Sequence, residues 1–221
     1  MVFVFVSYSR RDDNIINFFT KIFSRIGINF ETEIKKRGYY PRGGGLIEIG
    51  IIPCKKLSPV SLLERTTKST RLVCSYSKIP KGVVEKEVDS AKTVLEAGGF
   101  SCDYVVKEEN ALDRGCSMLV FSRDRNSVIG SDSIYQGKME GVGEFIARKF
   151  VQSNLGVDLC LADMLVVPLS LINETSTYRI KQITKHLETN LFVASKITDC
   201  KYGIGRLDDG FEVRIVGSSY S

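Results

Sequence analysis

Residues 71–107, RLVCSYSKIPKGVVEKEVDSAKTVLEAGGFSCDYVVK, predict the fold class more clearly than any other stretch of this 221-residue chain. Residues 71–77 form an apolar, strand-like run. Residues 83–97 then repeat apolar side chains at helical spacing, and residues 101–107 are strand-like again. Gly98 and Gly99 supply a helix stop between them. This alternation of strand, helix and strand predicts an α/β fold.

The alternation continues toward the C-terminus, where residues 117–122 predict a strand and residues 139–152 a helix. The texture of the sequence changes near Pro59 and again near Gln152. We therefore expect residues 61–152 to form a small α/β unit of their own, set between two outer segments.

The outer segments also show regular patterns. Residues 1–6 predict a buried strand. Apolar side chains recur at helical spacing over residues 15–26, with Asp12 and Asp13 as N-cap candidates and Gly27 as the stop. Two strands are expected at 29–36 and 46–52. Beyond Gly156 the pattern predicts a helix at 158–171, a polar turn at 173–176, a strand at 178–183 and a helix at 187–197. A closing hairpin is expected around the turn 207–210.

Composition is that of an ordinary globular protein, with 43% hydrophobic and 26% charged residues. The net charge of +5 leans mildly toward polyanions such as nucleotides or RNA, although many metabolic enzymes are equally basic. The six cysteines form no CxxC pair and there is one histidine, so we expect no metal site. Scattered thiols and the lack of a membrane-length apolar run predict a cytoplasmic protein.

The segment Arg37-Gly-Tyr-Tyr-Pro-Arg-Gly-Gly-Gly45 is the most unusual in the chain. One interpretation is a hairpin loop in which glycines take positive φ angles and Pro41 fixes a turn. The other is a phosphate-binding loop, in which backbone N–H groups and Arg37 or Arg42 approach a phosphate while tyrosines stack on bases. Residue composition leaves both open.

Two further residues could carry chemistry. His186 follows Thr184 and Lys185 at a predicted strand-to-helix junction. A lone histidine is usually a surface or core residue, but a neutral imidazole there could attack a phosphorus centre. Asp163 lies inside the apolar run 159–171. It is either a boundary carboxylate or a contact for a metal–nucleotide complex.

Together these segments resemble the RNA 3'-terminal phosphate cyclases. Residues 37–45 match that family's Arg-Gly-Tyr-Tyr-Pro-Lys/Arg-Gly-Gly-Gly segment. Ile183-Thr-Lys-His-Leu-Glu-Thr-Asn190 resembles its Ile-Thr-Ser-His-Leu-Leu-Thr-Asn segment, whose histidine becomes adenylylated. Leu161-Ala162-Asp163 stands where the family reads Asp-Glu-His-Leu-Ala-Asp-Gln, a stretch that contacts ATP.

The resemblance implies an enzyme that uses ATP and a divalent metal ion, Mg²⁺ or Mn²⁺, to convert an RNA 3'-terminal phosphate to a 2',3'-cyclic phosphate through a histidyl-AMP intermediate. It implies a main domain of repeated α/β units, residues 1–60 and 153–221, interrupted by an inserted small α/β domain at 61–152. His186 would be the nucleophile, and Arg37 and Arg42 would contact RNA. The implied ATP contacts are Cys160, Leu161, Ala162, Asp163 and Met164.

The chain also departs from the family pattern. Leu159-Cys160 and Met164 replace the family's Glu-His and Gln, so fewer polar groups are available to ATP. Family sequences begin with a further section that we expect to be missing here, in a truncated, split or inactive member. Expected partners are RNA 3' ends, ATP, and either a second copy or a complementary N-terminal fragment.

A second function remains open, that of a non-catalytic, cyclase-like RNA-binding or ribosome-assembly factor. Proteins of that kind lack the nucleophilic histidine, so His186 favours the enzyme.

Overall fold

The computed structural model describes the backbone of residues 13–135 and 137–218, and side chains in those ranges from residue 20 onward. These residues form five helices and ten strands, which confirms the predicted α/β class. The predicted strand at residues 1–6 lies outside the described residues. Within the described residues, no helix is both long and apolar enough to cross a membrane.

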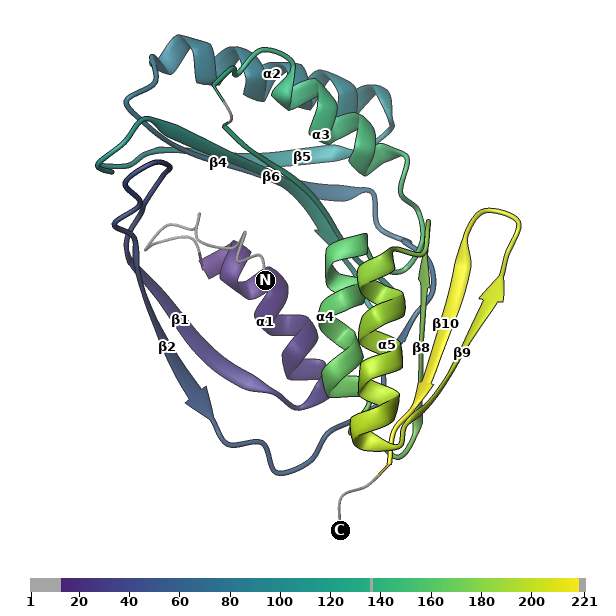
Figure 1. The fold of residues 1–221 in the computed structure, drawn as a ribbon. Helices are drawn as coiled ribbons and strands as arrows, with labels where there is room; N and C mark the ends of the chain where they lie inside the picture. The colour runs from purple at the N-terminus through teal and green to yellow at the C-terminus, as the bar shows by residue number, and fades with distance from the viewer. Residues whose placement is uncertain (1–12, 136, 219–221) are drawn as a thin grey trace.

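The stretch that predicted the fold forms the middle of a four-stranded sheet. Strand β4 (Ser69–Ser77) pairs in parallel with β5 (Ser101–Glu108) and antiparallel with β6 (Gly115–Arg123), which pairs with β7 (Val128–Ile134). Helices α2 (Lys81–Ala97) and α3 (Val142–Val151) cover one face of this sheet, as Figure 1 shows. Their apolar sides bury the alternate β4 residues Leu72, Cys74 and Tyr76.

Two boundaries in this unit differ from the sequence prediction. Strand β7 was not predicted because its sequence, VIGSDSI, is half polar, although Val128 and Ile129 are buried against β6. Helix α3 begins at Val142 rather than Met139, because Gly141 takes a positive φ of 80° directly before it.

A second four-stranded sheet has the order β3-β8-β10-β9. Its strands are β3 (Ser61–Leu62), β8 (Thr175–Ile180), β9 (Lys201–Arg206) and β10 (Phe211–Val216). Helices α4 (Leu159–Leu169) and α5 (Lys185–Thr198) pack side by side on one face (Figure 1). Strand β8 begins inside the predicted turn and ends at Ile180, so Ile183 is not part of it.

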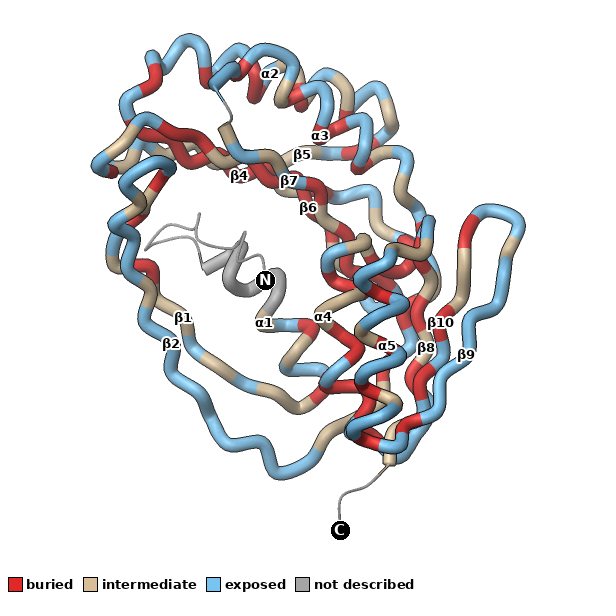
Figure 2. Tube along the Cα trace, viewed as in Figure 1, coloured by how far each residue is buried: buried red, intermediate tan, exposed pale blue. Residues whose placement is uncertain are grey.

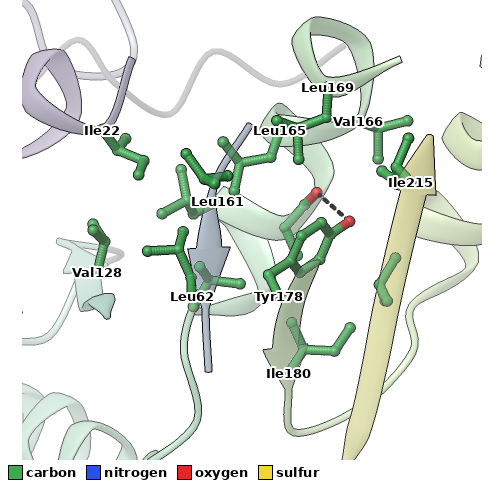
Figure 3. Close-up of a cluster of buried hydrophobic side chains, with 14 of the residues drawn as sticks. Ile22, Leu62, Val128, Leu161, Leu165, Val166, Leu169, Tyr178, Ile180 and Ile215 are labelled. Carbon is green, nitrogen blue, oxygen red and sulfur yellow. Dashed lines mark hydrogen bonds between the residues drawn. The ribbon is translucent and has the colours of Figure 1, made fainter. Parts of the chain in front are cut away.

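The core between these helices and their sheet is apolar with one polar anchor. Leu161 and Leu165 of α4 belong to the same buried cluster as Tyr178 and Ile180 of β8 (Figure 3). The buried Tyr178 hydroxyl donates a 3.3 Å hydrogen bond to the Ala162 carbonyl oxygen. This bond satisfies the phenol inside the core and fixes α4 against β8.

The N-terminal part is a smaller arrangement of helix α1 (Asp13–Ile26) and a two-stranded antiparallel hairpin, β1 (Asn29–Lys36) and β2 (Leu46–Ile52). Phe23 of α1 packs edge-on against Phe30 of β1, with ring centroids 5.9 Å apart. On β2, however, Ile49 and Ile51 are 61% and 80% exposed. The long pale-blue run along β2 in Figure 2 reflects this exposure.

The two four-stranded sheets contribute side chains to one common apolar cluster. Val73 of β4 and Leu119 of β6 belong to the same apolar cluster as Leu161 of α4 and Tyr178 of β8. The sheet of β4–β7 therefore has an apolar layer on both faces. The proposed domain boundaries near residues 60 and 152 stay a prediction.

Candidate functional site

His186 is the second residue of helix α5, and its side chain is exposed. Thr184 caps the helix: its Oγ1 accepts a 3.0 Å hydrogen bond from the backbone N–H of Leu187. The free N–H groups and the positive end of the helix dipole therefore lie beside the imidazole. An anionic phosphate placed next to His186 would be stabilised by both.

Asp163, from the neighbouring helix α4, lies close to this helix start. The Thr184 hydroxyl donates to Asp163 Oδ1 at 3.4 Å. Burial raises the pKa of the partly buried Asp163 carboxyl, while the Thr184 hydrogen bond and the charge of His186 oppose that rise. Asp163 and His186 therefore interact in the structure although they stand 23 positions apart in the sequence.

The first turn of α4 contains a second carboxylate. Asp158 caps the helix by accepting from the Leu161 N–H at 2.9 Å, and it also accepts from the Gly130 N–H of β7 at 2.9 Å. Burial, with a smaller contribution from the Asp132 carboxylate, raises the pKa of Asp158 to about 6. Its role in the structure is to join α4 to β7.

Cys160 is exposed on the same turn. Its sulfur atom is nevertheless partly enclosed by neighbouring atoms, and this desolvation, together with the charges of Asp158 and Asp132, raises the pKa of the thiol to about 11. The thiolate is the nucleophilic form of cysteine, so at neutral pH Cys160 is a weak competitor for His186.

The residues predicted to contact ATP divide into two groups. The side chains of Leu161 and Ala162 are buried in the core. Those of Cys160, Asp163 and Met164 are exposed or partly buried. Among the described residues, no group of three or more histidine, cysteine, aspartate or glutamate side chains is placed to hold a metal ion.

The glycine-rich loop 37–45 forms the tip of the β1–β2 hairpin and rests on the β4–β6 sheet (Figure 1). Gly43 and Gly44 have positive φ angles of 66° and 72°, as the hairpin interpretation predicted. Tyr39 is buried; its hydroxyl donates to the Ser75 carbonyl oxygen at 3.1 Å and its ring packs on Gly115. The loop therefore docks the hairpin onto the sheet.

The two arginines of this loop differ in exposure. The Arg37 side chain is 2% exposed, and its Nε donates to Glu109 Oε1 at 3.2 Å. The Arg42 side chain is 63% exposed and pairs with Asp113 at 2.9 Å. Of the two predicted RNA contacts, Arg42 is the one with an accessible guanidinium group.

The structure does not place this loop beside His186. Gly115, under the loop, begins β6, whereas Gly130, which binds Asp158 on α4, pairs with Phe121. Six positions along a strand correspond to about 20 Å. The loop and the start of α4 therefore lie toward opposite ends of the β4–β7 sheet.

Sequence reasoning did not assign a role to Thr184 or Asp158. Both are helix N-caps, and their signal was present in the sequence as a threonine or aspartate directly before an apolar periodic run. Their contacts with Asp163 and Gly130 depend on how α4 packs, which no local pattern specifies.

Comparison with known proteins agrees with the resemblance seen in the motifs. The family model described as "RTC: RNA 3'-terminal phosphate cyclase" matches residues 6–204. Curated proteins named RNA 3'-terminal phosphate cyclase are similar along most of the chain. The relative from Methanococcoides burtonii is 29% identical over 95% of this chain and 63% of its own length. That from Pyrobaculum aerophilum is 28% identical over 92% and 61%. That from Saccharolobus solfataricus is 30% identical over 89% and 60%.

The chain spans about 60% of the length of these curated relatives. The family match nevertheless covers 199 of its 221 residues, including the loop 37–45, Asp163 and His186. The chain belongs to the RNA 3'-terminal phosphate cyclase family.

Proposed function

We propose that this chain takes part in the ATP-dependent conversion of an RNA 3'-terminal phosphate to a 2',3'-cyclic phosphate, through a covalent histidyl-AMP intermediate. The observation that carries the proposal is the exposed imidazole of His186 at the start of α5, with the Asp163 carboxyl beside it. The family match over residues 6–204 supports the same reaction.

The proposed chemistry has three balanced steps. An imidazole nitrogen of His186 attacks the α-phosphorus of ATP; an N–P bond forms, the bond to the bridging oxygen breaks, and pyrophosphate leaves. A 3'-phosphate oxygen of RNA then attacks the same phosphorus and releases His186. Finally the neighbouring 2'-hydroxyl oxygen attacks the activated 3'-phosphorus and loses its proton to solvent. The bond between that phosphorus and the oxygen it shares with the AMP phosphate breaks, and AMP leaves with that oxygen.

Asp163 and the helix end would assist the first step. A carboxylate close to the imidazole stabilises positive charge that develops on the ring as its nitrogen attacks. The N–H groups at the start of α5 favour a negatively charged phosphate at the same place. Cys160 and Met164, which stand where the resemblance expects polar groups, supply little further polarity to the nucleotide.

The divalent metal ion that the resemblance implies does not fit a site made of the described residues alone. They hold no group of three donors placed for a metal ion, and Asp163 is the carboxyl group that Thr184 contacts at the start of α5. Mg²⁺ is commonly bound through one or two carboxylates together with substrate phosphates. The three steps above therefore use only side chains of this chain and its substrates.

We further propose that the active assembly contains more polypeptide than this chain. The relatives are longer, and β2 carries large apolar side chains that its own hairpin leaves exposed, Ile49 at 61% and Ile51 at 80%. A complementary fragment that covers this face is the partner we favour, and a second copy of the chain is the alternative. The exposed Arg42 and Tyr40 would contact RNA.

The test is adenylylation with ATP labelled on its α-phosphate, performed on the chain alone and with the relatives' additional section supplied. We expect a protein–AMP adduct that is labile in acid and stable in base, as a phosphoramidate should be. His186→Ala should abolish it, and Cys160→Ala, which removes the nearby thiol, should leave it.

Two results would contradict the proposal. An adduct that survives His186→Ala would exclude His186 as the nucleophile. RNA binding without an adduct under either condition would favour the non-catalytic, cyclase-like RNA-binding factor.

A further inference from the structure

Thr184 connects two helices through a single hydroxyl group. Its backbone is extended, with φ −96° and ψ 154°, as expected for a residue that precedes a helix. The oxygen accepts from the Leu187 N–H of α5 at 3.0 Å and donates to Asp163 Oδ1 of α4 at 3.4 Å. The start of α5 is therefore linked to a side chain of α4 as well as capped.

The two contacts fix the orientation of the hydroxyl group. A threonine hydroxyl has one proton and can accept through its lone pairs. An amide N–H can only donate, so the proton is left for the Asp163 carboxylate. The donor contact is long, as hydrogen bonds around catalytic groups often are before a substrate binds.

Asp163 is not held by a cation within the described residues, which makes the Thr184 contact important. Its carboxyl is partly buried, and burial raises its pKa. Of the two groups that oppose this rise, Thr184 contributes more than the charge of His186. Asp158 and Asp132, which also act on this turn, are acidic, and the cation Lys149 acts on Cys160 rather than on Asp163.

We propose that Thr184 is a positioning residue, whose hydroxyl holds the first turn of α5 against Asp163 so that the His186 imidazole is aligned for attack. The inference rests on the proposed function for its catalytic consequence. Its structural part, that the Thr184 donor sets the environment of His186, stands independently. Displacements of about 1 Å at a reacting group can reduce a rate by about a hundredfold.

Three substitutions separate the donor role from the capping role. Thr184→Ser keeps both contacts. Thr184→Asp keeps the cap, since aspartate is a strong N-cap residue, but has no proton to donate to Asp163. Thr184→Val removes both. Thr93→Val is the matched control, because Thr93 Oγ1 donates to the Asp89 carbonyl oxygen within α2 and the same atoms are lost there.

Two readouts are taken from each protein. The first is the initial rate of labelling by α-labelled ATP, under the condition in which the wild type reacts. The second is the set of imidazole NMR signals without nucleotide, which needs no assignment because the chain has one histidine. We expect Thr184→Ser and Thr93→Val to match the wild type in both. Thr184→Val and Thr184→Asp should move the imidazole signals and lower the labelling rate by about tenfold to a hundredfold.

The outcomes are distinguishable. If Thr184→Asp labels at the wild-type rate with unmoved imidazole signals, capping alone suffices and the proposal is wrong. If Thr184→Val lowers the thermal stability but leaves the imidazole signals unchanged, Thr184 is only a helix cap. If no protein is labelled, the wild type included, the proposed function fails, and the NMR comparison still decides whether Thr184 positions His186.

Discussion

Replacing Arg37 with alanine should destabilise the fold rather than weaken RNA binding directly. Arg37 directly follows β1, and its partner Glu109 directly follows β5, so their ion pair joins the β1–β2 hairpin to the β4–β7 sheet. The Arg37 side chain is 2% exposed and that of Glu109 is 23% exposed. An arginine so enclosed cannot present its guanidinium group to a phosphate without leaving the sheet.

The expected size of the effect follows from this burial. Removing one partner of a buried ion pair costs about 3–5 kcal/mol, because the other charge stays without compensation. Glu109 keeps some contact with water, so Arg37→Ala belongs at the low end, about 3 kcal/mol. For a chain of this size that corresponds to a fall of about 6–12 °C in Tm.

The assay compares Arg37→Ala with Arg42→Ala. Calorimetry gives Tm, and fluorescence anisotropy with a short 3'-phosphate RNA gives affinity at two salt concentrations, below both melting temperatures. The Arg42 side chain is 63% exposed although its partner Asp113 is 12% exposed, so Arg42→Ala should lower Tm less than Arg37→Ala does. It should also weaken RNA binding and reduce by about one the slope of log affinity against log salt concentration. An unchanged Tm in Arg37→Ala, with RNA affinity lost, would refute this reasoning and make Arg37 an RNA contact.

Three further predictions concern other parts of the chain. Because burial raises the pKa of Asp158 to about 6, its folded state binds the proton more tightly than its unfolded state. As pH falls from 7 to 4, the free energy of unfolding of the wild type should therefore rise relative to that of Asp158→Asn, by about 3 kcal/mol at most. Urea unfolding would contradict this if the difference between the two proteins stayed constant across that range. Replacing Ile49 and Ile51 with lysine should reduce self-association in sedimentation experiments, whereas Glu48→Lys on the opposite face of β2 should not. If both changes had the same effect, the face that carries Ile49 and Ile51 would not be the surface through which the chain associates. A Cβ at Gly115 would lie 2.1 Å from Cγ of Tyr39, so Gly115→Ala should lower the free energy of unfolding by about 1–3 kcal/mol. Gly50→Ala should lower it much less, because the nearest atom there is 3.8 Å from the added Cβ. Equal unfolding midpoints for the two variants would show that Tyr39 and its loop can move away without loss of stability.

Much of the fold was predictable because its signals are local. The apolar periodicity of residues 83–97 and the stop at Gly98 and Gly99 indicated α2, which the structure confirms at Lys81–Ala97. Strand β7 was missed because its outward side chains are polar and its strand character comes from pairing with β6. The order of the strands in each sheet depends on contacts between distant segments, which periodicity does not encode.

The candidate site was predictable only in part. The exposed position of His186 at a helix start agrees with the predicted strand-to-helix junction. The burial of Arg37 was not foreseen, because the letters Arg-Gly-Tyr-Tyr-Pro-Arg are equally suited to bind phosphate and to dock on a sheet. Which of these occurs depends on Glu109 and Gly115, more than seventy residues away.

The pairing of β3 with β8 has a consequence for the order in which the chain can fold. Leu62 pairs with Tyr178, so this contact closes a loop of more than one hundred residues and cannot form until β8 has been synthesised. The intervening sheet shortens the search, because the Arg65 N–H donates to the Asn154 carbonyl oxygen at 2.9 Å and holds the two ends of that segment together. The connections that remain to be closed then make up about a quarter of that loop, a saving of about 1 kcal/mol in loop entropy. On the ribosome, residues 65–154 are therefore expected to fold first and to bring β3 within reach of a partner that has yet to emerge.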